Sequence, residues 1–175
     1  FTSKDVIFQT AKIFTENIFN HVISSEPKLE IDNLELDKYK KKYNFDINFK
    51  HIILGVSASG PTKRWDIDNF IKLARKIKNK KKCKFYLAGG LDDKHIINKF
   101  ISSGFQDCSF SLENLQIKEI MHVIKNSDLY IGNDTGFMHI SAGLGLKCIG
   151  LFFDSPAYSY SCLLYTSPSP RDNRV

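Results

Sequence analysis

The sequence predicts an α/β fold built on a doubly wound, parallel sheet. From residue 51 onward, short apolar runs alternate with longer segments whose apolar residues recur at helical spacing. Polar and small residues follow the apolar runs, as they do where ligands bind beyond the carboxyl ends of parallel strands. Five strands separated by four helices favour parallel pairing with right-handed crossovers.

The expected elements follow one another without an internal repeat. Strands are expected at residues 51–56, 83–90, 107–110, 128–132 and 147–153. Helices are expected between them, at residues 65–79, 92–104, 112–127 and 135–145. Asp66 is a candidate N-cap for the first of these helices, and Gly104 is suited to close the second. The residues expected to face the core from the third helix are Leu115, Ile120, Met121 and Ile124.

Residues 1–50 do not share this alternation. Apolar residues at helical spacing predict a helix at residues 6–22, an extended piece follows at 28–31, and a weaker helix at 34–43. We expect residues 1–50 to be the end of a preceding N-terminal domain and an interdomain connection. Residues 51–161 form the expected ligand-binding domain, and residues 162–175 a disordered or non-native tail.

The charge distribution and the cysteines indicate which partners and which cellular compartment to expect. The chain has 175 residues and a net charge of +6, and much of the excess lies at residues 75–84. This cluster is expected to be the solvated end of a helix, with an anionic membrane surface as the alternative. Nucleic acid is not expected, because no aromatic residues interleave the run. Four cysteines without CxxC spacing, no signal peptide and no apolar run of bilayer length indicate a reducing cytoplasm.

The loop "SASGPTKRW" after the first expected strand is a candidate phosphate site. Its small residues let a ligand approach the backbone, Ser59 and Thr62 offer hydroxyls, and Lys63 offers a positive charge. A polar surface loop with an ordinary lysine is the alternative. Trp65 is expected to pack under the following helix rather than to stack on a ligand.

The stretch "GNDTGFMH" after the fourth expected strand carries a second cluster. Free N–H groups at a helix start suit a diphosphate, Thr135 adds a hydroxyl, and Gly136 leaves the approach clear of a Cβ. Asp134 would accept hydrogen bonds from sugar hydroxyls or else cap the helix. His139 lies on the same helix face as Thr135 and could contact the same ligand. The alternative interpretation of His139 is a buried histidine of the core.

Two further residues complete the candidate site. Asp92, just past the second expected strand, is placed to bind ribose hydroxyls, with a solvated helix-start acid as the alternative. Phe110 is a candidate wall of a nucleobase pocket and equally a core residue. No G-x-G-x-x-G follows the first strand, which argues against a nicotinamide-dependent oxidoreductase.

Three stretches of the chain resemble one known family. The segments "GVSASGPTKRW", "KFYLAGGLDD" and "SLENLQIKEIMHVIKNSDLYIGNDTGFMHISAGLGLKCIGLF" occur in the order and spacing of glycosyltransferase family 9, the lipopolysaccharide core heptosyltransferases. The resemblance covers residues 52–159 and is to the C-terminal domain of that family. The motif GNDTGxMHxxAxLG, together with the upstream GPTKRW, is its most specific part.

The resemblance implies a GT-B enzyme with two Rossmann-like domains, of which residues 51–161 form the truncated, donor-binding one. It implies ADP-heptose or a similar nucleotide sugar as donor and a lipid-linked core oligosaccharide as acceptor. It also implies inversion at the anomeric carbon, no metal and no cofactor, and a cytoplasmic location with peripheral contact at the inner membrane. The catalytic base would be a carboxylate of the N-terminal domain, so this fragment is expected to bind a nucleotide without turnover.

The resemblance also implies a role for each site residue. Ser59 and Lys63 would hold the diphosphate, and Lys63 would stabilise it as the leaving group. Asp92 would bind the ribose, although the family often has a Glu there, and Phe110, at a position that varies in the family, would lie by the base. The residues expected to contact the diphosphate and the sugar are Asp134, Thr135, Gly136 and His139.

Two other interpretations keep the fold and change the function. The first is a GT-B transferase that uses another nucleotide sugar, and the second is a non-catalytic nucleotide-binding module. The tail "CLLYTSPSPRD" looks like translated sequencing-adaptor sequence, so residues from about 162 onward are expected to be an artefact.

Overall fold

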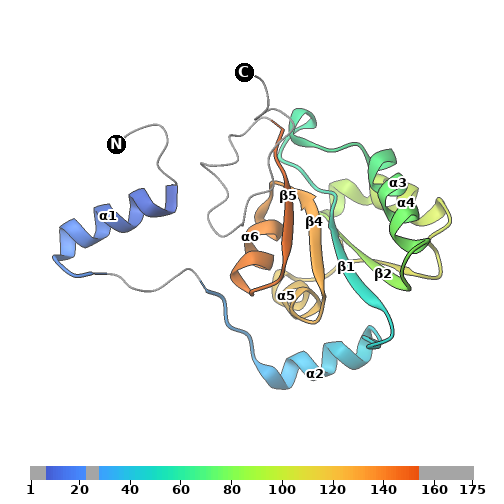
Figure 1. Ribbon diagram of the computed structural model, residues 1–175, viewed down its shortest axis with the longest axis horizontal. Helices are drawn as coiled ribbons and strands as arrows, with labels where there is room; N and C mark the ends of the chain where they lie inside the picture. Colours follow the sequence, from blue (N-terminus) through green and yellow to red (C-terminus); the bar gives the residue numbers. More distant parts are fainter. Residues whose placement is uncertain (1–6, 23–27, 154–175) are drawn as a thin grey trace.

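The computed structural model describes residues 7–22 and 28–153. Within them, five strands form one parallel sheet in the order β3-β2-β1-β4-β5, with helices on both faces (Figure 1). The chain starts in the middle of this sheet, extends to one edge through β2 and β3, and returns to the other side of β1 with β4 and β5. The predicted α/β class and parallel pairing are confirmed.

The elements fall where the sequence predicts them. The strands are β1 (Lys50–Gly55), β2 (Cys83–Ala88), β3 (Ser109–Ser111), β4 (Leu129–Asn133) and β5 (Cys148–Leu151). The helices between them are α3 (Ile67–Lys78), α4 (Lys94–Ser102), α5 (Ile117–Lys125) and α6 (Gly136–Gly143). The predicted helix 92–104 differs at its start, because Leu91–Asp93 form a separate 3-10 turn.

Local signals set the ends of two helices as expected. The Asp66 carboxylate accepts a hydrogen bond of 2.7 Å from the Asp68 N–H and caps α3. Gly104 follows α4 with φ of +98°, a left-handed conformation that glycine adopts without a Cβ clash.

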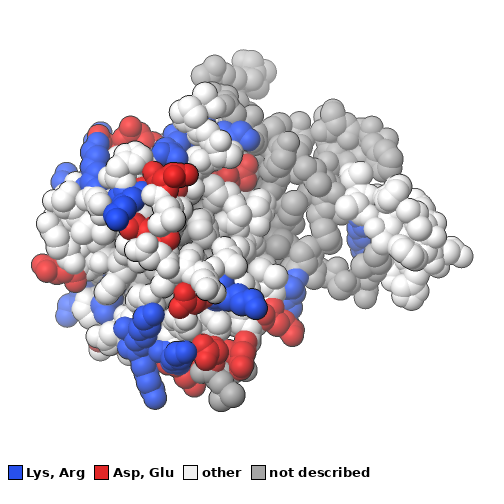
Figure 2. Space-filling view, turned by 180° about the vertical axis from the view of Figure 1, so that it is seen from behind, with Lys and Arg blue, Asp and Glu red and all other residues white. Residues whose placement is uncertain are grey.

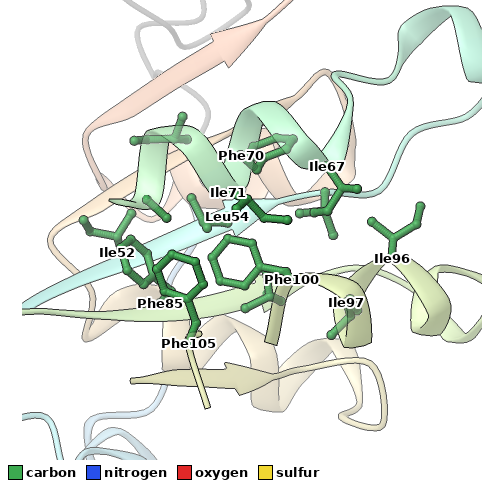
Figure 3. Close-up of a cluster of buried hydrophobic side chains, with 14 of the residues drawn as sticks. Ile52, Leu54, Ile67, Phe70, Ile71, Phe85, Ile96, Ile97, Phe100 and Phe105 are labelled. Atoms are coloured by element: carbon green, nitrogen blue, oxygen red, sulfur yellow. The ribbon is translucent and has the colours of Figure 1, made fainter. Parts of the chain in front are cut away.

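One face of the sheet, covered by α3 and α4, carries a core of aliphatic and phenylalanine side chains (Figure 3). We call it the α3/α4 face. Phe85 of β2 lies edge-on to Phe100 and Phe105, whose own rings stack with centroids 4.6 Å apart. Trp65 meets the Phe70 ring edge-on at 4.8 Å, so its predicted packing role under α3 is confirmed.

The other face, covered by α5 and α6, has a core that includes tyrosines. We call it the α5/α6 face. Its buried residues include Tyr86 of β2, Tyr130 of β4 and Met138 of α6. Ile120 and Ile124 of α5 are buried as predicted, while Leu115 and Met121 pack partly buried against the cluster.

The residues before the sheet form two helices, α1 (Ile7–Phe19) and α2 (Asn33–Lys42). Helix α2 packs against α5: Tyr39 stacks on the His122 ring at 5.0 Å, and its hydroxyl donates to Glu119 Oε1 at 2.7 Å. Helix α1 lies apart from the sheet in Figure 1 and exposes Phe14 and Phe19 to solvent. Of the predicted connection, α2 is therefore part of the packed domain.

The extended piece that follows α1 reaches the end of α6. The Leu29 N–H donates to the Gly143 carbonyl at 2.8 Å. The Leu29 side chain packs so closely there that a Cβ on Gly143 would lie 3.1 Å from it. This contact joins the chain that enters the domain to the last turn of α6.

The cysteines of the described residues, Cys83, Cys108 and Cys148, are free thiols. Burial raises the pKa of Cys83 to about 11 and that of Cys148 to about 12, so both act as apolar side chains. Over residues 7–22 and 28–153, no helix has the length and apolar character to cross a membrane. The predicted tail at 162–175 and the loop "DSP" at 154–156 lie outside the described residues.

Candidate functional site

A pocket of about 340 Å³ opens at the carboxyl ends of β1 and β4. Two segments from loops after these strands supply its polar side, and helices α5 and α6 supply its apolar side. The lining residues are Ser57, Ala58, Ser59, Ile117, Asp134, Thr135, Gly136, Phe137 and Ile140. The position is the one that the parallel topology favours for ligands.

Asn133, at the end of β4, holds the loop after β1 in place. Its side chain is fully buried, and its Oδ1 accepts a hydrogen bond of 3.0 Å from the Trp65 N–H. Its Nδ2 donates to the carbonyls of Val56 and Ser57 at 3.3 and 3.1 Å. One amide therefore satisfies three backbone groups of a loop that begins 77 residues earlier in the chain.

Tyr130 packs against the strand ends that border the pocket. Its side chain is buried, and its hydroxyl donates to the Asn133 carbonyl at 3.2 Å. A Cβ on Gly55 would lie 1.9 Å from this hydroxyl, and a Cβ on Gly132 would lie 2.5 Å from the Gly55 Cα. Glycine is required at both positions because the phenol passes directly over the paired ends of β1 and β4. Burial raises the pKa of Tyr130 well above its usual value, so the phenol stays neutral.

The start of α6 presents the polar groups that the sequence predicts for a diphosphate. Thr135 occupies the N-cap position in an extended conformation, with no hydrogen bond from its side chain to the helix. Its hydroxyl oxygen is buried and has no partner with hydrogen-bond geometry among the described residues, although the Tyr130 hydroxyl, which donates to the Asn133 carbonyl, lies near it. The first N–H groups of a helix have no partner within it, and Gly136 leaves open space beside them. A buried hydroxyl beside free N–H groups favours an acceptor from outside the chain.

Asp134 and His139 face each other at the same corner. His139 Nε2 lies 3.6 Å from Asp134 Oδ1, too far for a hydrogen bond but close enough for attraction when the imidazole is protonated. The core-histidine alternative is wrong, since the His139 side chain is 41% exposed. The capping alternative for Asp134 is also wrong, because Thr135 occupies the cap position and Asp134 lines the pocket.

The rest of the loop after β1 borders a second hollow of about 410 Å³. Ala58 and Ser59 line both hollows, and Gly60, Pro61, Arg64 and Asp66 complete the second. Lys63 is half-buried in the 3-10 turn Pro61–Lys63, and Thr62 is exposed there. Neither side chain lines the pocket, so the structure does not bring Lys63 to the Thr135 corner.

An ion pair that the sequence analysis missed joins the loops after β1 and β2. Arg64 Nη2 lies 2.8 Å from Asp93 Oδ1, and the second carboxylate oxygen accepts a hydrogen bond of 3.0 Å from the Gly90 N–H. The Asp93 side chain is only 6% exposed, whereas Asp92, the predicted ribose ligand, is exposed to solvent. Helix phase does not distinguish them, because Asp92 and Asp93 precede the buried Ile96 and Ile97 by four residues each.

Phe110 does not lie at the pocket. Its ring stacks on Tyr86 at 5.3 Å and meets Tyr43 edge-on at 6.2 Å, within the core of the α5/α6 face. This arrangement corresponds to the core alternative for Phe110. Among the described residues, no group of three His, Cys, Asp or Glu side chains is placed to hold a metal ion.

Known proteins resemble the chain in sequence profile and in fold. The sequence profile of glycosyltransferase family 9 (heptosyltransferase) matches residues 6–162. A search of curated protein sequences gives no match. The likeness is therefore carried by the family profile and by solved structures.

Three solved structures resemble the chain. ADP-heptose lps heptosyltransferase II of E. coli has a TM-score of 0.72 at 20% identity, over 81% of this chain and 44% of that chain. A glycosyl transferase family 9 protein of Veillonella parvula gives 0.73 at 17% identity, over 89% and 47%. The E. coli heptosyltransferase WaaC with ADP gives 0.69 at 13%, over 95% and 52%. At these identities the likeness shows the fold, and the chain spans about half the length of each protein.

Proposed function

Since the chain belongs to glycosyltransferase family 9 (heptosyltransferase), we propose that it is the donor-binding part of a transferase. In this proposal the enzyme transfers heptose from ADP-heptose to the inner core of lipopolysaccharide, with inversion and without a metal ion. The acceptor is a lipid-linked core oligosaccharide, reached from the cytoplasm by peripheral contact with the inner membrane. The catalytic base belongs to the N-terminal half of the family fold.

The observation that carries the proposal is the start of α6. The unpartnered Thr135 hydroxyl and the free N–H groups beside it offer donors to a diphosphate, and the helix adds about half a positive charge. Ser59 lies across the pocket on the loop after β1. Asp134 would repel a phosphate, so we assign it to sugar hydroxyls, together with His139.

Lys63 is proposed to stabilise the leaving diphosphate, the electrostatic task that a metal ion performs in other transferases. The Lys63 side chain lies outside the pocket. This role therefore requires the side chain to change its conformation when the donor binds, so that its ammonium passes Ser59 and reaches the diphosphate. Asp92 is exposed and keeps its proposed contact with the ribose only if the donor extends over the loop after β2.

Nucleotide titration tests the proposal. We expect the chain to bind ADP more tightly than UDP or GDP, as measured by calorimetry. Thr135→Val should weaken ADP binding about tenfold, because a hydrogen bond to a charged group contributes roughly 1.5–3 kcal/mol. Ser102→Ala, on the exposed end of α4, is the matched control and should bind ADP as the parent chain does. An unchanged affinity in Thr135→Val would refute the site.

A second candidate keeps the transferase and changes the donor. It is favoured by the position of Phe110, which leaves the proposed base contact without a side chain in the pocket. Tighter binding of UDP or GDP than of ADP would support this candidate. Lys63→Ala separates both candidates from a non-catalytic module, since only a leaving-group role predicts weaker binding of the diphosphate.

A further inference from the structure

The turn between α2 and β1 exposes an isoleucine almost completely. Ile47 is 96% exposed, more than any other large hydrophobic side chain of the described residues. The turn around it is fixed: Asp46 Oδ1 accepts hydrogen bonds of 2.9 and 2.8 Å from the backbone and side chain of Asn48. The Asp46 carbonyl accepts from the Phe49 N–H at 3.0 Å and contacts His51 Nε2 at 3.0 Å. Ile47 is therefore held at the tip of an ordered turn.

Exposed lysines surround this tip at the amino ends of the strands. We call this group the basic edge; its members are Lys40, Lys41, Lys42, Lys50, Lys80, Lys81 and Lys82. In Figure 2 blue side chains, with red ones beside them, project from the lower margin, along which α2 lies in Figure 1. The lysines come from the end of α2, the start of β1 and the turn after α3.

Backbone contacts bring these segments together. The Lys50 N–H donates to the Lys82 carbonyl at 2.8 Å, and the Phe45 N–H donates to the Lys40 carbonyl at 3.0 Å. Lys84 connects the two sides, since its ammonium donates to the Asn44 carbonyl at 2.8 Å. The basic edge is thus one surface, although its lysines come from separate parts of the sequence.

The acids near this surface leave most of its charge free. Asp128 pairs with Lys50 at 2.7 Å, and Asp46 is engaged within its own turn. Glu35 pairs with Lys38 one turn earlier on α2. Among the described residues, the other six lysines of the basic edge have no carboxylate within ion-pair distance. Of these six, Lys42 is partly engaged, since its ammonium lies over the Tyr39 and Tyr43 rings at 5.5 and 5.4 Å.

We propose that the basic edge, with Ile47 at its centre, docks on an anionic phospholipid bilayer. Lysines near such a surface are attracted to its headgroups, and an aliphatic side chain held among them enters the boundary of the acyl chains. Ile47 would not contribute to binding a nucleic acid, because phosphates bind cationic side chains and bases stack on aromatic ones. This docking deepens the membrane contact contained in the proposed function and rests on it.

The docked orientation has a defined geometry. The basic edge lies at the amino ends of the strands and the pocket at their carboxyl ends. A six-residue parallel strand such as β1 spans about 20 Å. The pocket opening therefore lies about one strand length from the lipid, where a water-soluble donor reaches it without crossing the headgroups.

Vesicle sedimentation tests the proposal. The chain is mixed with vesicles of phosphatidylcholine alone or with about one quarter phosphatidylglycerol. We expect binding to the anionic vesicles only, falling steeply when salt rises from about 0.05 to about 0.5 M. Ile47→Asp should reduce the partition coefficient at least about tenfold. Replacing Lys80, Lys81 and Lys82 by Gln should reduce it by about fivefold per lysine.

Matched controls come from the rest of the surface. Leu91 is 68% exposed at the opposite end of the sheet, and Leu91→Asp should bind vesicles as the parent chain does. Gln at Lys72, Lys94 and Lys118 together removes the same charge away from the basic edge and should change binding less than about twofold. Circular dichroism of each variant confirms that the fold is retained.

Three results would overturn the proposal. Unchanged binding by Ile47→Asp would place the lipid contact elsewhere, for instance on the apolar helix α1. Equal binding to neutral vesicles would remove the role of charge. Binding to neither kind of vesicle would refute the docking surface. ADP titration of the same samples distinguishes failure of the docking proposal from failure of the proposed function. A chain that binds ADP but not vesicles would refute only the docking surface.

Discussion

The two faces of the sheet each bury a core of apolar side chains but differ in their chemistry. The α3/α4 face is packed with aliphatic side chains and three interlocking phenylalanines. The α5/α6 face buries tyrosines and histidines. Among the described residues, buried polar side-chain atoms without a partner occur on both sides: the Thr135 hydroxyl and His122 Nε2 on the α5/α6 side, and Arg64 Nε on the α3/α4 side. Such atoms cost stability, and one of them lies at the pocket. We infer that the α3/α4 core mainly provides stability, whereas the α5/α6 side also carries the unpartnered hydroxyl that lies at the pocket.

The largest expected effect tests the stabilising face. Phe100 is fully buried and contacts both Phe85 and Phe105. Phe100→Ala should lower the free energy of unfolding by about 3–5 kcal/mol, measured by urea denaturation. ADP affinity of the folded protein should stay within about twofold, because the cavity lies across the sheet from α6. A large loss of affinity would contradict the division between the faces.

The Arg64–Asp93 pair is the polar exception on the α3/α4 side. Asp93→Ala removes the partner of the Arg64 guanidinium and the acceptor of the Gly90 N–H. We expect a loss of about 2–3 kcal/mol in the free energy of unfolding, below the range for a fully buried pair because Arg64 is 29% exposed. A double-mutant cycle with Arg64→Met measures the coupling, and additive effects would show that the pair contributes nothing.

Two glycines differ in the space available for a side chain: a Cβ would clash at Gly55 and would meet open space at Gly60. Gly55→Ala places a methyl group against the Tyr130 hydroxyl and should lower the free energy of unfolding by about 1–3 kcal/mol while also displacing the strand ends beside the pocket. Gly60→Ala is the control, since a Cβ there meets nothing within 4 Å and should change stability by less than about 0.5 kcal/mol. Thermal unfolding of the two variants, followed by ADP titration, makes the comparison. Equal stability would mean that Tyr130 moves without cost.

The smallest effect concerns pH. His51 Nδ1 lies 2.9 Å from the Tyr86 hydroxyl and Nε2 lies 3.0 Å from the Asp46 carbonyl, an arrangement that suits the neutral ring with its proton on Nε2. Burial lowers the pKa of His51, against the opposing effect of its bond to Asp46. The folded state therefore disfavours the proton, and stability that is present above the unfolded pKa of 6.5 is lost as the pH falls below it.

Unfolding free energies measured between about pH 7.5 and about pH 5.5 check the sign. The decline should be smaller in His51→Gln than in the parent chain, because the variant has no proton to take up at this position. An equal decline in both would assign the pH dependence to the other histidines.

The sequence predicts the elements well because each depends on local periodicity and on its own end signals. Asp66 and Gly104 act within a few residues of the helix ends they define. The pocket corner was also predictable, since the parallel order alone brings residues 57–59 and 134–136 to one edge.

The contacts that hold the pocket together were not predictable in this way. Asn133 meets its partners only through the register that sets Gly55 against Gly132. Lys63 and Arg64 are adjacent cations, and only the packed loops show that Arg64 meets a buried acid. Phe110 pairs with Tyr86 across β2 and β3, so its packing also depends on strand order.

The contact between Leu29 and Gly143 has a mechanical consequence. It lies at the last residue of α6, whose eight residues span only about 12 Å to the first turn at Thr135. Because so short a helix moves as one rigid piece, we expect a displacement of the chain at Leu29 to shift the first turn of α6, which borders the pocket.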